Sequence, residues 1–303
     1  MMNNTKKPNC LTITWIAEAS IASFNAGDKE ADNLVSLKKI TRQDGQYVYI
    51  SGQAVRRAIR DRLREMGEEL SLIPVEEGED RKQTAHTQGD PASFIDDDLF
   101  GFMIAEKGQA KTATKRTAPV RVAPMISLTP WSGETDFGAN FMKLDQGGNP
   151  NLFEAEIDGG FYRGTVLIEL DRIGQGEGYE KGKEDPSNKR VERIKKLLWA
   201  IRDLWLAGRQ SRFLGDLSPK VLAAALTSAK VPLFLESVFV GKDGQLSLTG
   251  MYEALKDRQD IIIEKVFGGT EKYRPLFPEE CEAVTIGAAF EKIGSWIKPE
   301  LFE

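Results

Sequence analysis

Hydrophobic positions in the first third of the chain alternate in some segments and recur at helical spacing in others. Residues 11–24 are rich in β-branched and aromatic side chains, which predicts a strand. Asp44-Gly45 lies between two short extended runs and predicts a β-hairpin. From residue 53 to 66 the apolar residues follow a helical period, and Gly67 is a typical stop. This part of the chain therefore predicts strand, hairpin and amphipathic helix.

The same patterns continue further along the chain. Residues 119–129 predict a strand entered and left through prolines, and 165–170 predict another. Apolar residues from 191 to 205 recur at helical spacing. A hairpin is predicted from 231–240 and 246–248. In outline the order is strand, helix, strand, long excursion, strand, helix, strand, which predicts an α+β fold of the ferredoxin-like, RNA-recognition-like class with insertions.

Three segments do not fit that alternation. Residues 68–109 are heterogeneous and polar, and we interpret them as an insertion that contains a short helix. Residues 137–144 and 152–157 are extended arms around a turn-rich stretch, which predicts a projecting hairpin. Residues 174–190 contain one apolar side chain, Tyr179, and are expected to form a mobile surface loop.

The amino-acid composition limits the kinds of catalytic or metal site that the protein can contain. The 303 residues include two cysteines and one histidine, His86, so a disulfide framework, a multi-histidine metal site and a histidine-activated nucleophile are not expected. The net charge of −5 is unlike that of a simple nucleic-acid binder. However, residues 107–131 are basic and contain no acidic residue, so a locally positive face is possible on this acidic protein.

One side of the predicted helix is basic. At about 100° per residue, its polar side chains fall within one quadrant, whereas its apolar residues occupy another. Ser51 precedes the helix, where free backbone N–H groups and the helix dipole favour a phosphate. The alternative is a solvated face with Ser51 as an ordinary cap. The stripe consists of Gln53, Arg56, Arg57, Arg60 and Arg64.

Further candidates for nucleic-acid contacts lie outside this helix. Arg209, Gln210 and Arg212 follow the second helix and suit a phosphate or sugar edge, although a helix-ending loop explains them equally well. Lys115 and Arg116 leave the same two interpretations open. Phe141, between Asn140 and Met142 on the projecting hairpin, would insert between bases or pack against its own domain.

No metal or cofactor is expected. Asp96-Asp97-Asp98 is acidic enough to suggest a cation, but adjacent carboxylates do not converge on one ion, so a capped short helix is favoured. The glycines from 174 to 178 lack the strand-turn-helix context of a dinucleotide site. No run is long enough to span a membrane, and the segment after Lys6-Lys7 has a strand pattern and contains Glu18, unlike a signal peptide. We expect a soluble, cytoplasmic protein.

Four motifs in order resemble a known family. They are Ile-Ser-Gly-Gln-Ala-Val-Arg-Arg-Ala-Ile-Arg at 50–60, Asp-Leu-Phe-Gly at 98–101, Arg-Thr-Ala-Pro-Val at 116–120 and Gly-Arg-Gln-Ser-Arg-Phe at 208–213. Over about residues 11–235 the chain resembles the DevR branch of the Cas-seven family, the repeated backbone subunits of CRISPR type I-B Cascade.

The resemblance implies a single hand-shaped domain over residues 1–303. Its palm would be ferredoxin-like, with a finger region inserted at 68–114, a thumb β-hairpin at 132–158 and the loop at 172–190. In the family, matching positions hold the backbone of a guide RNA, and the thumb of a neighbouring copy kinks the guide. The implied backbone contacts are Asn25, Ser51, Gln53, Arg56, Arg57, Arg209 and Arg212, and the implied thumb contacts are Asn140, Phe141 and Met142.

The implied function is a non-catalytic scaffold. Its partners would be guide crRNA, target DNA paired with that guide, other copies in head-to-tail contact and other Cascade subunits. One alternative is a metal-dependent ribonuclease, since type III relatives cut RNA with an aspartate near the first-strand loop, and Asp28 and Asp32 lie there. The other is a regulator that binds duplex DNA directly, although no helix-turn-helix pattern supports it.

Overall fold

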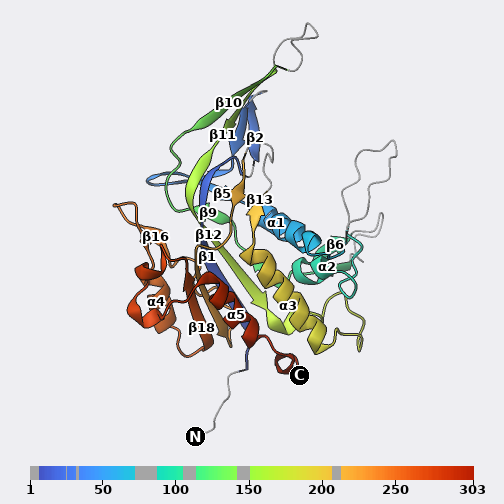
Figure 1. The fold of residues 1–303 in the computed structure, drawn as a ribbon. Helices are drawn as coiled ribbons and strands as arrows, with labels where there is room; N and C mark the ends of the chain where they lie inside the picture. Colours follow the sequence, from blue (N-terminus) through green and yellow to red (C-terminus); the bar gives the residue numbers. More distant parts are fainter. Residues whose placement is uncertain are drawn as a thin grey trace, which may run out of the picture.

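A large antiparallel sheet forms the centre of the protein (Figure 1). The computed structural model describes residues 7–24, 26–31, 34–71, 87–104, 114–141, 151–206 and 213–303. Within them the strand order is β18-β15-β1-β12-β9-β5-β4, and β8 pairs with β12 outside this path. The strands are β1 (Cys10–Ala22), β4 (Lys39–Arg42), β5 (Gly45–Ile50), β8 (Val120–Val122), β9 (Met125–Ser127), β12 (Asp158–Glu169), β15 (Val221–Thr227) and β18 (Ile262–Gly269).

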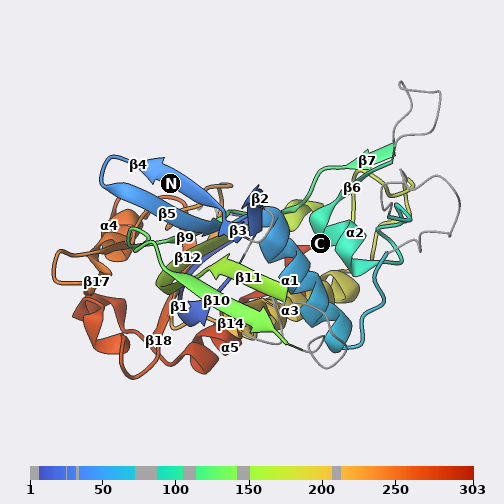
Figure 2. The ribbon, with the colours of Figure 1, turned by 90° about the horizontal axis from the view of Figure 1, so that it is seen from above.

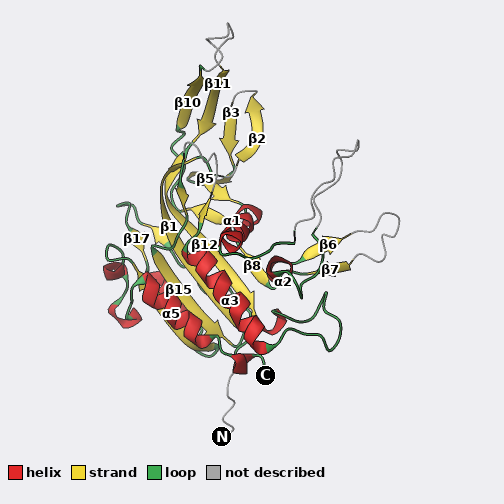
Figure 3. Ribbon diagram, turned by 45° about the vertical axis from the view of Figure 1, so that its right-hand side comes forward, coloured by secondary structure: helices red, strands yellow, loops and turns green. Residues whose placement is uncertain are grey.

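Three helices cover one face of this sheet (Figure 3). They are α1 (Gly52–Glu65), α3 (Ser187–Arg202) and α5 (Ile286–Trp296). Their apolar stripes meet alternate residues of β1, such as Leu11 and Trp15, which are fully buried. Burial of these stripes fixes α1 and α3 against the centre of the sheet.

The opposite face has its own core, built around Phe234 and Phe267 with Ile16 of β1. Here α4 (Thr249–Lys256) and the short strands β16 (Phe239–Val240) and β17 (Leu246–Ser247) lie near η3 (Arg274–Leu276) and η4 (Glu279–Cys281). Because both faces of the central strands are covered, β15 is buried along its whole length.

A second sheet projects from one end of the central one (Figures 1 and 3). Its order is β10-β11-β3-β2. The predicted pairing of two arms is confirmed, since β10 and β11 are antiparallel from Thr135↔Glu156 to Asn140↔Asn151. The addition of two earlier strands to this hairpin was not predicted. The strands are β2 (Ala26–Ala31), β3 (Leu34–Leu37), β10 (Thr135–Asn140) and β11 (Asn151–Glu156).

A third group of elements lies at the end of the molecule opposite α4 (Figure 2). It contains α2 (Ile95–Phe100) and the paired strands β6 (Phe102–Ile104) and β7 (Thr114–Arg116). Other short elements are η2 (Leu170–Arg172), β13 (Trp205–Leu206), β14 (Gly215–Asp216) and η5 (Pro299–Leu301). In the described part of the chain, no helix has the length and apolar character that a membrane crossing requires.

The predicted α+β class, with an antiparallel sheet, is confirmed. The hairpin predicted from 231–240 and 246–248 is confirmed only at its inner end, where β16 and β17 pair at Phe239↔Ser247 and Val240↔Leu246. Residues 233–236 form a turn, and β15 takes the place of the last strand in the predicted order. The run Val-Leu-Ala-Ala-Ala-Leu-Thr of β15 lacks alternation, since it is buried on both faces and its alanines have weak strand propensity. The single strand predicted over 119–129 is two strands, β8 and β9.

Candidate functional site

The start of α1 is fixed by its cap and by one glycine. Ser51 has the extended backbone of an N-cap, and its Oγ accepts a hydrogen bond from the Ala54 backbone N–H at 3.3 Å. Gly52 lies so close to β8 that a Cβ there would stand 2.6 Å from the Val122 carbonyl oxygen. The first turn of α1 is therefore seated on the end of β8, with Gln53 exposed beside it.

The basic stripe on α1 is largely paired with carboxylates. Arg57 Nε lies 3.1 Å from Asp61 Oδ1 and Arg64 Nη1 lies 3.2 Å from the same oxygen. Arg60 turns toward α2, where its Nε lies 3.1 Å from Asp96 Oδ2 and its guanidinium stacks over Phe100 at 4.8 Å. The expected outward stripe of unpaired guanidinium groups is thus only partly present, because helical spacing also brings Asp61 within reach.

Arg56 differs from its neighbours. Its side chain is half-buried on α1, and within the described residues no carboxylate forms an ion pair with it. Burial lowers the pKa of Arg56, and the nearby positive charge of Arg60 lowers it further. A half-buried cation without a counter-charge is costly, and a bound anion would relieve that cost.

Arg116 is not an exposed ligand, which corrects the expectation from sequence. Its side chain is fully buried, and Nη2 lies 2.5 Å from Asp98 Oδ1. The remaining N–H groups donate to the backbone carbonyls of Asp98, Gln175, Glu177 and Arg172. With all its donors occupied inside the protein, this guanidinium is structural. The adjacent Lys115 is exposed.

Asp98 is the centre of a buried ionic cluster that joins α2, β7 and α3. Besides Arg116, it receives Arg193 Nη1 at 2.8 Å and the Gly174 backbone N–H at 3.0 Å. Arg193 Nη1 also lies 2.6 Å from Asp185. The short helix α2 is confirmed, but it has no side-chain cap, and its three aspartates are all buried.

The same cluster anchors the segment predicted as a loop over 172–190, which has no helix or strand between residues 173 and 186; its mobility stays a prediction. Asp185 is buried. Tyr179 Oη lies 2.7 Å from the Pro91 carbonyl oxygen and 2.9 Å from Asp185 Oδ2, and it can donate a hydrogen bond to either. The segment is anchored by polar groups, which a count of apolar residues misses. One signal in the sequence was available: Arg190 and Arg193 occupy core-facing positions of α3 beside Ile194.

Several predicted site residues lie outside the described part of the chain, while some residues next to them in the sequence are described. They are Asn25, Met142, Arg209, Gln210 and Arg212, together with Asp32 and His86; the backbone of Asn140 and of Asp28 is described, but not the side chain. Phe24, directly before residue 25, lies against Gly215, three residues after residue 212. A Cβ on Gly215 would stand 3.1 Å from the Phe24 ring. The described residues that border residue 25 and residues 207–212 are therefore close to each other in the fold.

The projecting hairpin carries an apolar stripe. Phe137 and Phe141 are 65% and 57% exposed, and Leu152 is 44% exposed. Leu152 lies opposite Ala139, between the two phenylalanines in register, so the three side chains share one face of the hairpin. Phe141 is thus exposed on the hairpin, and its contact with bases stays a prediction.

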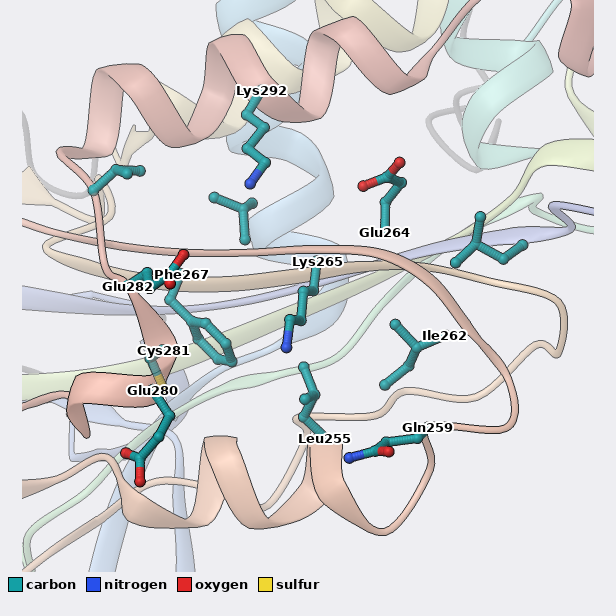
Figure 4. Close-up of a pocket in the computed structure, with 13 residues that line it drawn as sticks. Leu255, Gln259, Ile262, Glu264, Lys265, Phe267, Glu280, Cys281, Glu282 and Lys292 are labelled. Atoms are coloured by element: carbon teal, nitrogen blue, oxygen red, sulfur yellow. The ribbon is translucent and has the colours of Figure 1, made fainter.

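A cavity of about 430 Å³ lies on the outer edge of β18 (Figure 4). It is lined by Leu255, Lys265 and Phe267, and none of the predicted site residues reaches it. Burial raises the pKa of Cys281, which also lines it, to about 11, so this thiol is protonated at neutral pH and a poor nucleophile. Among the described residues, no group of His, Cys, Asp and Glu side chains is suited to hold a metal ion.

The chain is similar to known proteins over most of its length. The family model of the CRISPR-associated negative auto-regulator DevR/Csa2 matches residues 13–243. The CRISPR-associated protein Cas7/Cst2/DevR of Myxococcus xanthus (strain DK1622) is 27% identical over 280 residues, which cover 84% of each chain.

Two solved structures share the fold. A chain of a CRISPR RNA-guided surveillance complex, pre-nicking, superposes with a TM-score of 0.64 at 14% identity, over 95% of this chain and 100% of that one. A chain of a second CRISPR RNA-guided surveillance complex gives 0.59 at 15% identity, over 95% and 99%. With its family model matched across most of its length, this chain belongs to the DevR/Csa2 family, in the Cas7/Cst2/DevR group of CRISPR-associated proteins.

Proposed function

We propose that this protein is a non-catalytic backbone subunit of a CRISPR type I-B Cascade. It holds the phosphates of a guide crRNA and leaves the base edges free to pair with target DNA. Family membership supports this, as does a fold shared with chains of RNA-guided surveillance complexes.

The single observation that carries the proposal is Arg56. Its guanidinium is half-buried, without a carboxylate partner among the described residues, two turns or less from the capped start of α1. A phosphate at this place receives a charge-assisted hydrogen bond and restores the charge balance. Arg57 and Arg60 can bind a phosphate only by giving up their ion pairs with Asp61 and Asp96. We therefore expect each of them to contribute less to guide affinity than Arg56.

The topology supports a ferredoxin-like palm. The strands β15, β1, β12 and β8 are antiparallel neighbours in that order, with α1 and α3 on one face. This is the arrangement expected of an RNA-recognition-like fold. We assign the projecting sheet as the thumb, the α2–β6–β7 group as the finger region, and the whole chain as one domain.

The proposed partners follow from this role. Copies of the chain contact one another head-to-tail along the guide, because a subunit that tracks a polymer needs an open, non-closing interface. Other Cascade subunits bind the ends of this array, and target DNA is reached through the guide. Asn25, Arg209, Gln210, Arg212 and the thumb tip complete the predicted contacts.

Replacement of Arg56 by alanine tests the proposal. We expect guide affinity to fall by about tenfold or more, as for loss of a hydrogen bond to a charged group. Fluorescence anisotropy with a labelled guide measures this. The matched control is Arg64→Ala on the same helix, whose exposed side chain pairs with Asp61 and should leave affinity unchanged.

Two outcomes contradict the proposal. Equal affinity for Arg56→Ala and the wild type would remove the phosphate assignment. Cleavage of complementary RNA in Mg²⁺ by the assembled particle, abolished by Asp28→Ala, would instead establish the ribonuclease hypothesis.

A further inference from the structure

The thumb sheet meets the palm at a buried ionic contact. Glu156 ends β11 and is 5% exposed, and its Oε2 accepts a hydrogen bond from the Leu37 backbone N–H at 2.7 Å. Both carboxylate oxygens lie 2.6 Å from Lys39 Nζ. Leu37 ends β3 of the thumb sheet, whereas Lys39 begins β4 of the central sheet. One carboxylate therefore joins the two sheets.

Trp131 completes this contact. Lys39 Nζ lies 3.8 Å from the centre of the Trp131 ring, within cation–π range. The indole N–H donates to the Ile157 carbonyl at 2.9 Å, and the Trp131 backbone N–H donates to Gln46 of β5 at 2.7 Å. We call Lys39, Trp131 and Glu156 the latch. Together they contact β4, β5 and Ile157, which connects β11 to β12.

The latch acts on more than the hairpin. β3 pairs with β11 in parallel, at Leu34↔Glu154 and Val35↔Ala155, and β2 pairs with β3. The strand that begins directly after Asn25 therefore belongs to the same hydrogen-bonded sheet as the hairpin that carries Phe141. A change in the angle of this sheet moves both regions together relative to α1.

We propose that the latch sets the orientation of the thumb sheet relative to α1, so that Lys39, Trp131 and Glu156 are positioning residues for guide binding. This inference rests on the proposed function, in which α1 and the thumb sheet grip one RNA strand. A buried ion pair adds little net stability, because desolvation offsets the attraction, but its geometry is directional. Its location at the junction suits control of an angle.

Distance measurement on the full chain without RNA tests the orientation directly. Both native cysteines, Cys10 and Cys281, are buried, so nitroxide labels on Phe137→Cys in β10 and Lys195→Cys in α3 report the angle by pulsed electron paramagnetic resonance. We expect one narrow distance in the protein with an intact latch. Lys39→Met should lose that single peak, whereas Lys39→Arg, which keeps the charge and the ring contact, should retain it.

Guide affinity is the second readout. We expect Lys39→Met to bind guide RNA more weakly than Lys39→Arg at equal thermal stability, which a purely structural role would not produce. Glu156→Gln keeps an acceptor for the Leu37 N–H and removes the charge, so it serves if Lys39→Met fails to fold. A single narrow distance in Glu156→Gln, or a broadened distance with unchanged guide affinity, would overturn the proposal. Failure of the wild type to bind guide RNA would refute the proposed function. The label distances would still show whether the latch orients the thumb sheet.

Discussion

Asp158, the first residue of β12, shows how one half-buried side chain links stability to pH. Tyr162 Oη donates a hydrogen bond to its carboxylate. Burial raises the pKa of Asp158 and nearby Glu134 raises it further, although hydrogen bonds from Tyr162 and from the Gly159 backbone N–H partly offset this. Because the folded-state pKa lies above the unfolded value, the native state holds this proton more tightly, and stability falls as pH rises through that window.

Asp158→Asn removes the charge and keeps an acceptor for Tyr162. We expect the variant to be more stable than the wild type at pH 7 and the difference to shrink toward pH 4, about the pKa of an unfolded aspartate. Urea unfolding at both pH values measures it, with exposed Asp260→Asn as the control. A less stable variant at pH 7 would show that the ionised carboxylate is favourable here.

At the scale of elements, α2 and β7 are attached to the rest of the protein by ions as well as by apolar contacts. Arg116 and Arg193 converge on Asp98, and their side chains are at most 5% exposed. Such a cluster is stable only while every charge has its partner, because an unpaired buried charge is strongly unfavourable. The attachment of α2 and β7 therefore depends on single residues.

Removal of Arg116 should leave Asp98 incompletely compensated. We expect Arg116→Met to cost about 3–5 kcal/mol of unfolding free energy, the range for breaking a buried ion pair from one side. Lys115→Met, one residue earlier and exposed, should change it by about 0.5 kcal/mol or less. Chemical denaturation of both variants checks this, and similar values for the two would show that the cluster adds nothing to stability.

The whole molecule combines a net charge of −5 with a proposed anionic ligand. Overall charge opposes RNA binding at long range, so affinity must come from a few local cations such as Arg56. The acidic remainder then limits binding to other nucleic acids. The proposed scaffold role thus depends on where charge lies rather than on how much of it there is.

The dependence of guide binding on salt measures this local charge. Each phosphate contact with a single strand contributes a slope of about −0.7 to a plot of log affinity against log salt. If about five phosphates are neutralised per copy, affinity falls roughly a hundredfold between 50 and 200 mM salt. Arg56→Ala should reduce the slope by about 0.7 for each bound copy, and Arg64→Ala should not. A slope near zero for the wild type would exclude phosphate-based recognition.

The sequence by itself determined the elements whose own residues carry a local pattern of apolar and turn positions. β1, the β4–β5 hairpin, α1, α3 and the β10–β11 arms were predicted from local periodicity and turn residues. The family was also indicated by short motifs, and the comparisons confirm it. These features share one cause, since a strand or helix face is encoded within a few residues of itself.

Only the tertiary structure decided which charged residues remain available. Arg56 and Arg116 look alike in the sequence. However, Asp98, Arg172, Gln175 and Glu177 together occupy every donor of Arg116, while Arg56 meets no such partner among the described residues. The latch, likewise, brings Lys39 to Glu156 across more than a hundred residues. Partners that distant in the chain leave no local pattern, because only folding brings them together.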